Sequence, residues 1–419
     1  AANNTALGYN TLGENTTGVE NVAVGAYSLD ANTTADANTA FGYAALTTNT
    51  TGADNTAIGR SALFSNTTGA NNTAVGKMAL DANTTGVQNV AMGSTALDAN
   101  TTGNYNVGIG TGALTANTTG ELNTAVGQSA LLSNTTASNN TAVGYNALNL
   151  NTTASNNTAV GDSALESNTT GANNVAVGDQ ALETNTTGGD NVAIGQGALE
   201  LATTASNNTA VGKNALTANT TADANTACGR KALTACSTGT TNTAIGYDSG
   251  LIVTTGGNNG FYGYAAGKTT SPGGGITTES DRIVMGNNSI TDAYIKVAWN
   301  VTSDARDKSD ITDFTHGLSW INKLRPVTYR WDERSNYSDD LSVVPDGTHK
   351  KSRLNLGLLA QEELEVEKEH GYGNDNNDML ITHLSSDGNQ YSMKYERLVP
   401  VLVNAIKELS AKVTALEAK

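Results

Sequence analysis

The chain has 419 residues, with 45 glycines, 4 prolines and 5% aromatic residues. So little aromatic content in a glycine-rich chain argues against one large conventional core. The formal charge of −16 argues against nucleic acid as a partner, because phosphate binding requires clustered lysine and arginine. No apolar run approaches the roughly 20 residues of a membrane helix, so we expect no membrane insertion.

A glycine recurs every 17 residues from Gly8 to Gly263, in sixteen registers without an insertion. Such self-similarity indicates a repeat protein in which each unit stacks on the next. Short runs such as Asn-Thr-Ala-Val-Gly alternate β-branched residues with alanine, whereas helical repeats need about 30 or more residues of good helix formers. We therefore expect a β-solenoid shaft over residues 1–267, which at ~4.8 Å per coil would be a rod of roughly 75–80 Å.

Two positions in each unit are apolar. The residue before each glycine is apolar, as in Leu7, Val24 and Phe41, and the residue four after it is leucine from Leu12 to Leu233. We expect both side chains to be buried inside the coil. Because this is a small core, one copy would be only marginally stable, and we expect a homotrimer with three shafts side by side.

Two asparagine positions also recur. One stands four residues before each glycine, from Asn4 to Asn259, and a second usually stands seven after it, where it opens Asn-Thr-Thr. Asparagine tolerates left-handed turns and forms hydrogen-bonded ladders when identical residues lie one coil apart. The repeats resemble those in the heads of trimeric autotransporter adhesins, which are left-handed parallel β-rolls. They resemble the repeats of phage tail fibres still more. The longer 17-residue period leaves the handedness open.

The two cysteines, Cys228 and Cys236, are too few for a disulfide framework and have no second pair for a zinc site. They are either free thiols at repeat positions or a local bridge. The four histidines show no metal-ligand spacing, and we expect neither a metal nor a cofactor. The histidines are His316, His349, His370 and His383.

The repeat loses its leucine after Leu233, and a flexible break follows at Pro272–Gly275. Two strands are expected next, over Asp281–Gly286 and Ile290–Val301. We interpret residues 268–302 as an intertwined β tip or neck in which three chains interlock.

Residues 303–419 have the composition of an α+β domain. The pattern predicts a short helix that ends before Pro326, a strand over Val327–Trp331, an extended run over Leu354–Leu359 and a charged helix over Ala360–His370. The last 26 residues, about 394–419, carry apolar residues spaced 3-4-3-4-3, which is typical of a coiled-coil seam and permits a trimer. The seam residues are Val399, Leu402, Ile406, Leu409, Val413 and Leu416.

Four motifs then follow in a characteristic order: Ser303–Lys308, Leu324–Arg330, Gly357–Glu362 and Tyr395–Leu409. Together they resemble the endosialidase-type intramolecular chaperone domain that ends many phage tail spikes and fibres. The resemblance implies trimerisation of a fibre, followed by self-cleavage just before the serine of a Ser-Asp-x-Arg-x-Lys motif.

The resemblance makes Ser303 the nucleophile, Lys308 its base and Thr302–Ser303 the bond that is cut. A lysine can serve as a base only when neutral, a form that burial or a neighbouring cation favours. Arg306 would favour the neutral amine, whereas Asp304, Asp307 and Asp310 would oppose it. Asp307 also stands where the family commonly has an apolar residue. We expect the dyad to be weak until trimer assembly buries it, so whether this chain cleaves stays open.

We expect a homotrimeric phage tail fibre in the virion, outside the cell, whose C-terminal domain is a single-turnover serine autopeptidase. It would bind a host cell-surface receptor, a glycan or an outer-membrane component, and would join other tail proteins through chain that precedes Ala1. The alternative is a bacterial surface adhesin or another non-viral extracellular fibre that uses its repeats as the binding surface.

Overall fold

The structure is a computed structural model that describes residues 2–296, 301–338, 342–385 and 388–419. The chain divides into two compact units. The first comprises the residues up to Tyr264 together with Thr277–Ile283, and the second comprises Ala265–Ile276 and Val284–Lys419.

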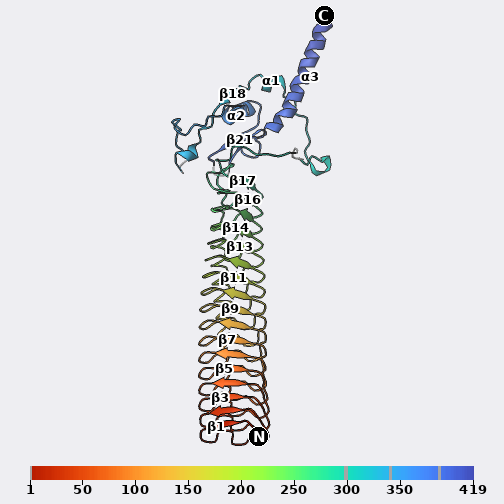
Figure 1. Cartoon of the computed structure of the whole chain (residues 1–419). Helices are drawn as coiled ribbons and strands as arrows, with labels where there is room; N and C mark the ends of the chain where they lie inside the picture. The colour runs from red at the N-terminus through yellow and green to blue at the C-terminus, as the bar shows by residue number, and fades with distance from the viewer. Residues whose placement is uncertain (1, 297–300, 339–341, 386–387) are drawn as a thin grey trace. The chain divides into compact units, whose positions relative to one another are not determined.

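The first unit is a parallel β-solenoid in which each 17-residue repeat forms one coil (Figure 1). Each strand has three residues, and from β1 to β15 each pairs with the strand one repeat later, so that Thr56 lies beside Thr73 and Ile58 beside Val75. The prediction of a mainly β fold built from 17-residue coils is confirmed. The strands are β1 (Thr5–Leu7), β2 (Val22–Val24), β3 (Thr39–Phe41), β4 (Thr56–Ile58), β5 (Thr73–Val75), β6 (Val90–Met92), β7 (Val107–Ile109), β8 (Thr124–Val126), β9 (Thr141–Val143), β10 (Thr158–Val160), β11 (Val175–Val177), β12 (Val192–Ile194), β13 (Thr209–Val211), β14 (Thr226–Cys228), β15 (Thr243–Ile245), β16 (Gly260–Tyr262) and β17 (Ile283–Met285).

Each coil closes through residues with left-handed backbone conformations. In the coil of β5 these are Asn71, Met78 and Leu80, with φ of 60°, 57° and 54°. The repeated glycine also has a positive φ, 142° at Gly76, and it is needed for a second reason as well. A Cβ on Gly76 would lie 2.4 Å from the carbonyl oxygen of Gly93, which is closer than real Cβ atoms approach. Glycine therefore permits both the backbone angle and the contact between successive coils.

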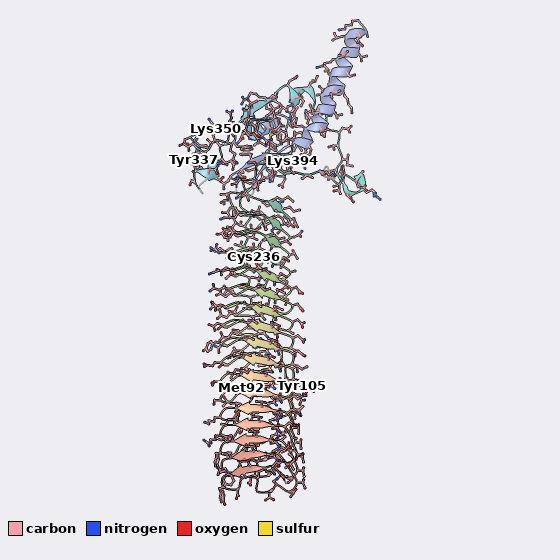
Figure 2. All side chains as sticks on the ribbon, in the orientation of Figure 1. Met92, Tyr105, Cys236, Tyr337, Lys350 and Lys394 are labelled. Atoms are coloured by element: carbon pink, nitrogen blue, oxygen red, sulfur yellow. The ribbon has the colours of Figure 1, made fainter. Side chains whose placement is uncertain are left out.

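The core of the solenoid consists of alanine and leucine. From the second coil on, the alanine at the centre of nearly every strand and the leucine four residues after the glycine are fully buried, as in Ala74 and Leu80. The residue before the glycine was predicted to be buried too, and this was wrong: Met92 is 43% exposed (Figure 2). Successive strand residues point to opposite faces. Because the central alanine points inward, its two neighbours must point outward.

Both asparagine positions form hydrogen-bonded ladders, as predicted. In the first, Asn38 Nδ2 donates to the carbonyl of Gly52 at 2.9 Å and its Oδ1 accepts from the backbone N–H of Asn55 at 3.0 Å. In the second, Asn66 Nδ2 donates to Asn49 Oδ1 at 2.8 Å. These side chains are buried. Each amide thus satisfies polar groups that the thin coil would otherwise bury without partners.

The second ladder is interrupted where Ala202 replaces asparagine. The side chain one coil earlier, Asn185, consequently has a buried Oδ1 without a hydrogen-bond partner. The side chain one coil later, Asn219, donates to the carbonyl of Ala222 at 2.9 Å. The interruption leaves a specific polar defect inside the shaft.

Replacing this alanine should repair the defect. Ala202→Asn would donate to Asn185 Oδ1, and we expect the free energy of unfolding to rise by about 1–2 kcal/mol, because a buried acceptor gains its missing partner. Chemical denaturation followed by far-ultraviolet circular dichroism measures the change. Ala218→Asn, at a half-buried position beside the ladder, is the control and should give no gain. Equal midpoints for the wild type and Ala202→Asn would contradict the account.

The two cysteines are free thiols, which decides between the two predicted alternatives. Cys228 is exposed at the end of β14, in the position before the repeated glycine. Cys236 is buried, and burial raises the pKa of its thiol to about 11.

The second unit has helices of different lengths and two small antiparallel sheets, β18 with β19 and β20 with β21. The elements predicted between Leu318 and His370 are confirmed, whereas the pair β20 and β21 was not predicted. The expected strand at Ile290–Val301 is wrong over 290–296, where no residue is in a strand, and 297–300 lie outside the described residues. The elements are η1 (Ala305–Asp307), α1 (Leu318–Ile321), β18 (Val327–Tyr329), η2 (Arg334–Asn336), β19 (Asn355–Gly357), α2 (Ala360–Glu369), β20 (Thr382–Leu384), β21 (Tyr391–Met393), η3 (Tyr395–Arg397) and α3 (Leu398–Glu417).

A hydrophobic core holds these elements together. It contains Trp320 of α1, Val366 of α2, Ile381 and Val401 of α3. Residues far apart in sequence therefore meet around one fully buried tryptophan.

Candidate self-cleavage site and assembly helix

Ser303 and Lys308 lie in direct contact. Lys308 Nζ is 2.6 Å from Ser303 Oγ, although five residues separate them. The single 3-10 turn η1 bends the chain between them, and Asp304 caps this turn by accepting the backbone N–H of Arg306 at 2.9 Å. The local sequence thus brings the proposed nucleophile and its proposed base together.

The charges around the dyad are paired differently from the expectation. The Arg306 guanidinium contacts the Asp304 carboxylate at 2.5 Å, and hydrogen bonds from Arg306 hold the pKa of Asp304 below its usual value. The charge of Arg306 is therefore paired with that of Asp304. Thr302, Ser303 and Lys308 are all exposed in the single chain.

The helix α3 has one buried face. Val401 and Ala405 are buried where the helix packs against α1. The contact is close, because a Cβ on Gly317 would lie 2.5 Å from the backbone nitrogen of Ala405. Glu408 accepts the backbone N–H of Leu318 at 3.1 Å. This face fixes α3 on the rest of the second unit.

The other face of α3 is apolar and uncovered. It carries the six residues predicted to form a coiled-coil seam, and their exposed fractions lie between 45% and 69%. A run of apolar side chains that faces water at heptad spacing is typical of a helix that associates with others.

An apolar groove of about 280 Å³ adjoins this face. Leu402 belongs to both the groove and the seam. The groove residues come from three of the four sequence motifs or lie beside them, which the sequence pattern alone did not indicate. They are Ile321, Leu324, Pro326, Leu356, Gly357, Leu358, Leu398 and Leu402.

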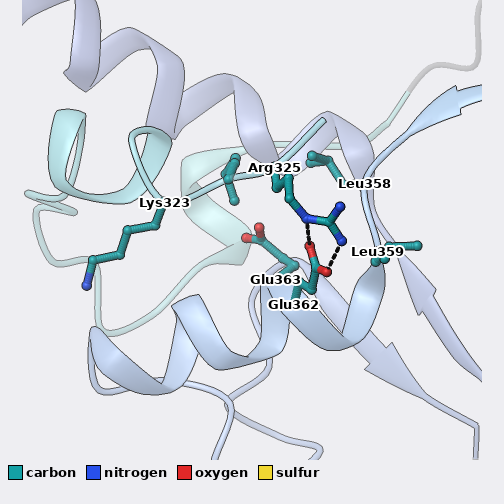
Figure 3. A pocket seen from close by; sticks show the side chains of 7 residues that line it. Lys323, Arg325, Leu358, Leu359, Glu362 and Glu363 are labelled. Carbon is teal, nitrogen blue, oxygen red and sulfur yellow. Dashed lines mark hydrogen bonds and ion pairs between the residues drawn. The ribbon is translucent and has the colours of Figure 1, made fainter. Parts of the chain in front are cut away.

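Polar contacts join the same motifs. Arg325 and Glu362 form an ion pair across a small pocket (Figure 3). The Tyr395 hydroxyl accepts the backbone N–H of Leu358 at 3.0 Å. The second, third and fourth motifs are therefore in contact through charged and polar groups as well as through the groove.

Two glutamates of α2 are buried, although the sequence predicted only a charged helix. Glu367 accepts three backbone N–H groups, from Leu380, Ile381 and Thr382, at 2.7–3.0 Å. Glu363 accepts the Trp320 indole N–H at 2.8 Å, and its other oxygen has no hydrogen-bond partner. No signal in the sequence distinguishes these two from the exposed Glu365 on the same helix.

Two of the four histidines lie in the aromatic surroundings of Trp320. The His370 ring stacks on the indole at 4.7 Å and lies 4.8 Å from the His316 ring. His349 packs edge-on against Tyr337, and His383 lies in β20. Within the described ranges, no group of three or more histidine, cysteine, aspartate or glutamate residues is placed to hold a metal ion.

Comparison with known families supports the interpretation of the C-terminal part. Residues 303–372 match the family model described as the chaperone of endosialidase. The matched segment contains the Ser303–Lys308 motif and the motifs that form the Arg325–Glu362 ion pair. A search of curated proteins found no match. In the part of the chain that the structure describes, no helix is long and apolar enough to span a membrane.

Burial should make the stability of the second unit depend on pH. Burial, and then the charge of Glu367, raises the pKa of Glu363 from 4.5 to about 7. The group's contribution to stability is therefore complete below pH 4.5 and is lost as the pH rises to about 7. We expect the denaturant midpoint, followed by tryptophan fluorescence, to fall between pH 5 and pH 8.

Glu363→Gln should flatten this dependence, because the amide keeps an acceptor for Trp320 and does not titrate. Glu365→Gln is the matched control on the exposed face of α2 and should retain the wild-type slope. The assignment fails when Glu363→Gln and wild type lose the same stability over this range.

Proposed function

We propose that the chain is a subunit of a homotrimeric extracellular fibre of the phage tail type, whose C-terminal unit assembles the trimer and then cleaves itself off before Ser303. The solenoid is suited to a long structural shaft. The match to the chaperone of endosialidase supports an assembly role for residues 303–372. The observation that carries the proposal is the uncovered seam of α3 beside an apolar groove.

Assembly would begin at the seam. Three copies of α3 in parallel would bury their six apolar positions against one another, as in a trimeric coiled coil. The neighbouring face, with Val401 and Ala405, is already packed against α1, so each helix would bring its own second unit into the trimer. Holding three chains together would then raise the local concentration of their shafts and favour their association.

Charges introduced into the seam should prevent this step. Ile406→Asp and Leu409→Asp each place a carboxylate at a core position of the coiled coil, where desolvation costs several kcal/mol. We expect the wild-type chain to have the molar mass of a trimer by light scattering and these variants to be largely monomeric. Ala411→Asp, on the opposite side of the heptad from the seam, is the control and should remain trimeric. A monomeric wild-type chain would refute the proposal.

Cleavage would follow assembly. The Ser303 hydroxyl would attack the carbonyl carbon of Thr302, forming an ester as the Thr302–Ser303 amide bond breaks. Lys308 would take the hydroxyl proton and pass it to the departing amine. Water would then hydrolyse the ester to leave a Thr302 carboxylate and a new N-terminus at Ser303. Burial of the exposed amine within the trimer would favour its neutral form and so couple cleavage to assembly.

This mechanism predicts two bands for the expressed wild-type chain on a denaturing gel, separated at Thr302 and Ser303. Ser303→Ala removes the nucleophile and Lys308→Arg keeps a cation that cannot serve as a base, so each variant should run as a single band. Ser309→Ala, beside the dyad, should cleave like the wild type. Cleavage that persists in Ser303→Ala would refute the assignment, and a trimer that stays uncut would leave only the assembly role.

The fibre would reside in the virion and would attach to a receptor on the host surface, a glycan or an outer-membrane component. Other tail proteins would bind the fibre within the virion. Reactivity would be confined to its own Thr302–Ser303 bond, because the dyad acts once on the residue that carries it.

A further inference from the structure

The outer face of the solenoid strands forms a continuous apolar stripe. It consists of the third residue of each strand from β1 to β16, directly before the repeated glycine. Nine of these side chains are large hydrophobic residues at least 36% exposed, and all the others except the exposed Cys228 are half-buried valines. The stripe contains Leu7, Val24, Phe41, Ile58, Val75, Met92, Ile109, Val126, Val143, Val160, Val177, Ile194, Val211, Cys228, Ile245 and Tyr262.

Charge is absent from this face. The first residue of each strand also points outward, and over β1 to β16 it is threonine, valine or, once, glycine. The column that follows the glycine, by contrast, contains Arg60, Lys77, Asp162 and other charged residues. The shaft thus carries charges in the turns beyond the strands in many coils, whereas none of these sixteen strands contains a charged residue.

The regular spacing of the stripe residues determines which partner can pack along the whole stripe. It repeats once per coil, at the spacing of neighbouring strands of ~4.8 Å, over a length of roughly 70 Å. Only a partner with the same rise can place an apolar side chain opposite each of its positions. A stripe of this length and about 10 Å wide would bury on the order of 700 Å² on each chain, which approaches the area of a stable interface.

We infer that this stripe is the surface along which shafts of the same chain pack against one another, in register, around the trimer axis. The inference rests on the proposed homotrimer and adds which face of each shaft contacts the other two shafts. Chains related by rotation about an axis parallel to the rods carry identical residues at identical heights. Each stripe residue therefore meets its own counterparts, and three Cys228 thiols come together at one level.

Cys228 provides the test in the native chain. Oxidation of the assembled protein with copper phenanthroline should link pairs of chains, so that up to about two thirds of them run as a dimer on a non-reducing denaturing gel. Cys228→Ala should abolish the dimer band, because Cys236 is buried.

The register is tested at a second level. In the Cys228→Ala background, Val126→Cys in the stripe should restore the dimer band. Thr119→Cys, an exposed residue of the same coil outside the strand face, should not. Light scattering on the same samples separates the two proposals. A trimer in which neither Cys228 nor Val126→Cys links, or in which Thr119→Cys links equally well, overturns the stripe and leaves the proposed function. A monomer overturns both.

Discussion

The stacking of identical residues at a spacing of one coil is the constraint on which the shaft depends. A coil of 17 residues is too thin to hide its backbone behind a thick core, so buried polar groups must find partners in the next coil. The two asparagine ladders meet this need, and the glycine column allows the coils to approach closely. The vacant acceptor of Asn185 beside Ala202 indicates how local the requirement is. At this position one departure from the repeat leaves one unpaired atom.

The thin coil also leaves apolar side chains exposed on its outer face. With alanine inside most strands, the larger valine, isoleucine or aromatic residue faces outward, and the seam of α3 faces water in the same way. Solvation of two such surfaces is unfavourable for a single chain and favours association with further copies. The shaft and the C-terminal helix thus each carry apolar surface that association with further copies would cover.

The sequence predicted much of this fold because its signals are periodic. Glycine, leucine and asparagine at fixed phases predicted the solenoid, and heptad spacing predicted α3. The sequence-based prediction failed where the direction of a side chain decides its burial. The residue before each glycine is apolar, but this did not reveal that the alanine beside it would point into the core instead. The buried Glu363 and Glu367 were also beyond it, because their environment comes from distant residues such as Trp320 and Leu380. The contact between Ser303 and Lys308 could be anticipated, since it depends on one short turn.

The central claim is that the C-terminal unit brings the chains together and the shaft then holds them. Refolding tests it most directly: the full chain and a chain that stops at Thr302 are unfolded in denaturant, diluted side by side and compared by light scattering. The account predicts that the full chain returns as a trimer, whereas the shortened chain yields few trimers and mostly monomer or aggregate. Equal recovery of trimeric shaft from both chains would contradict it.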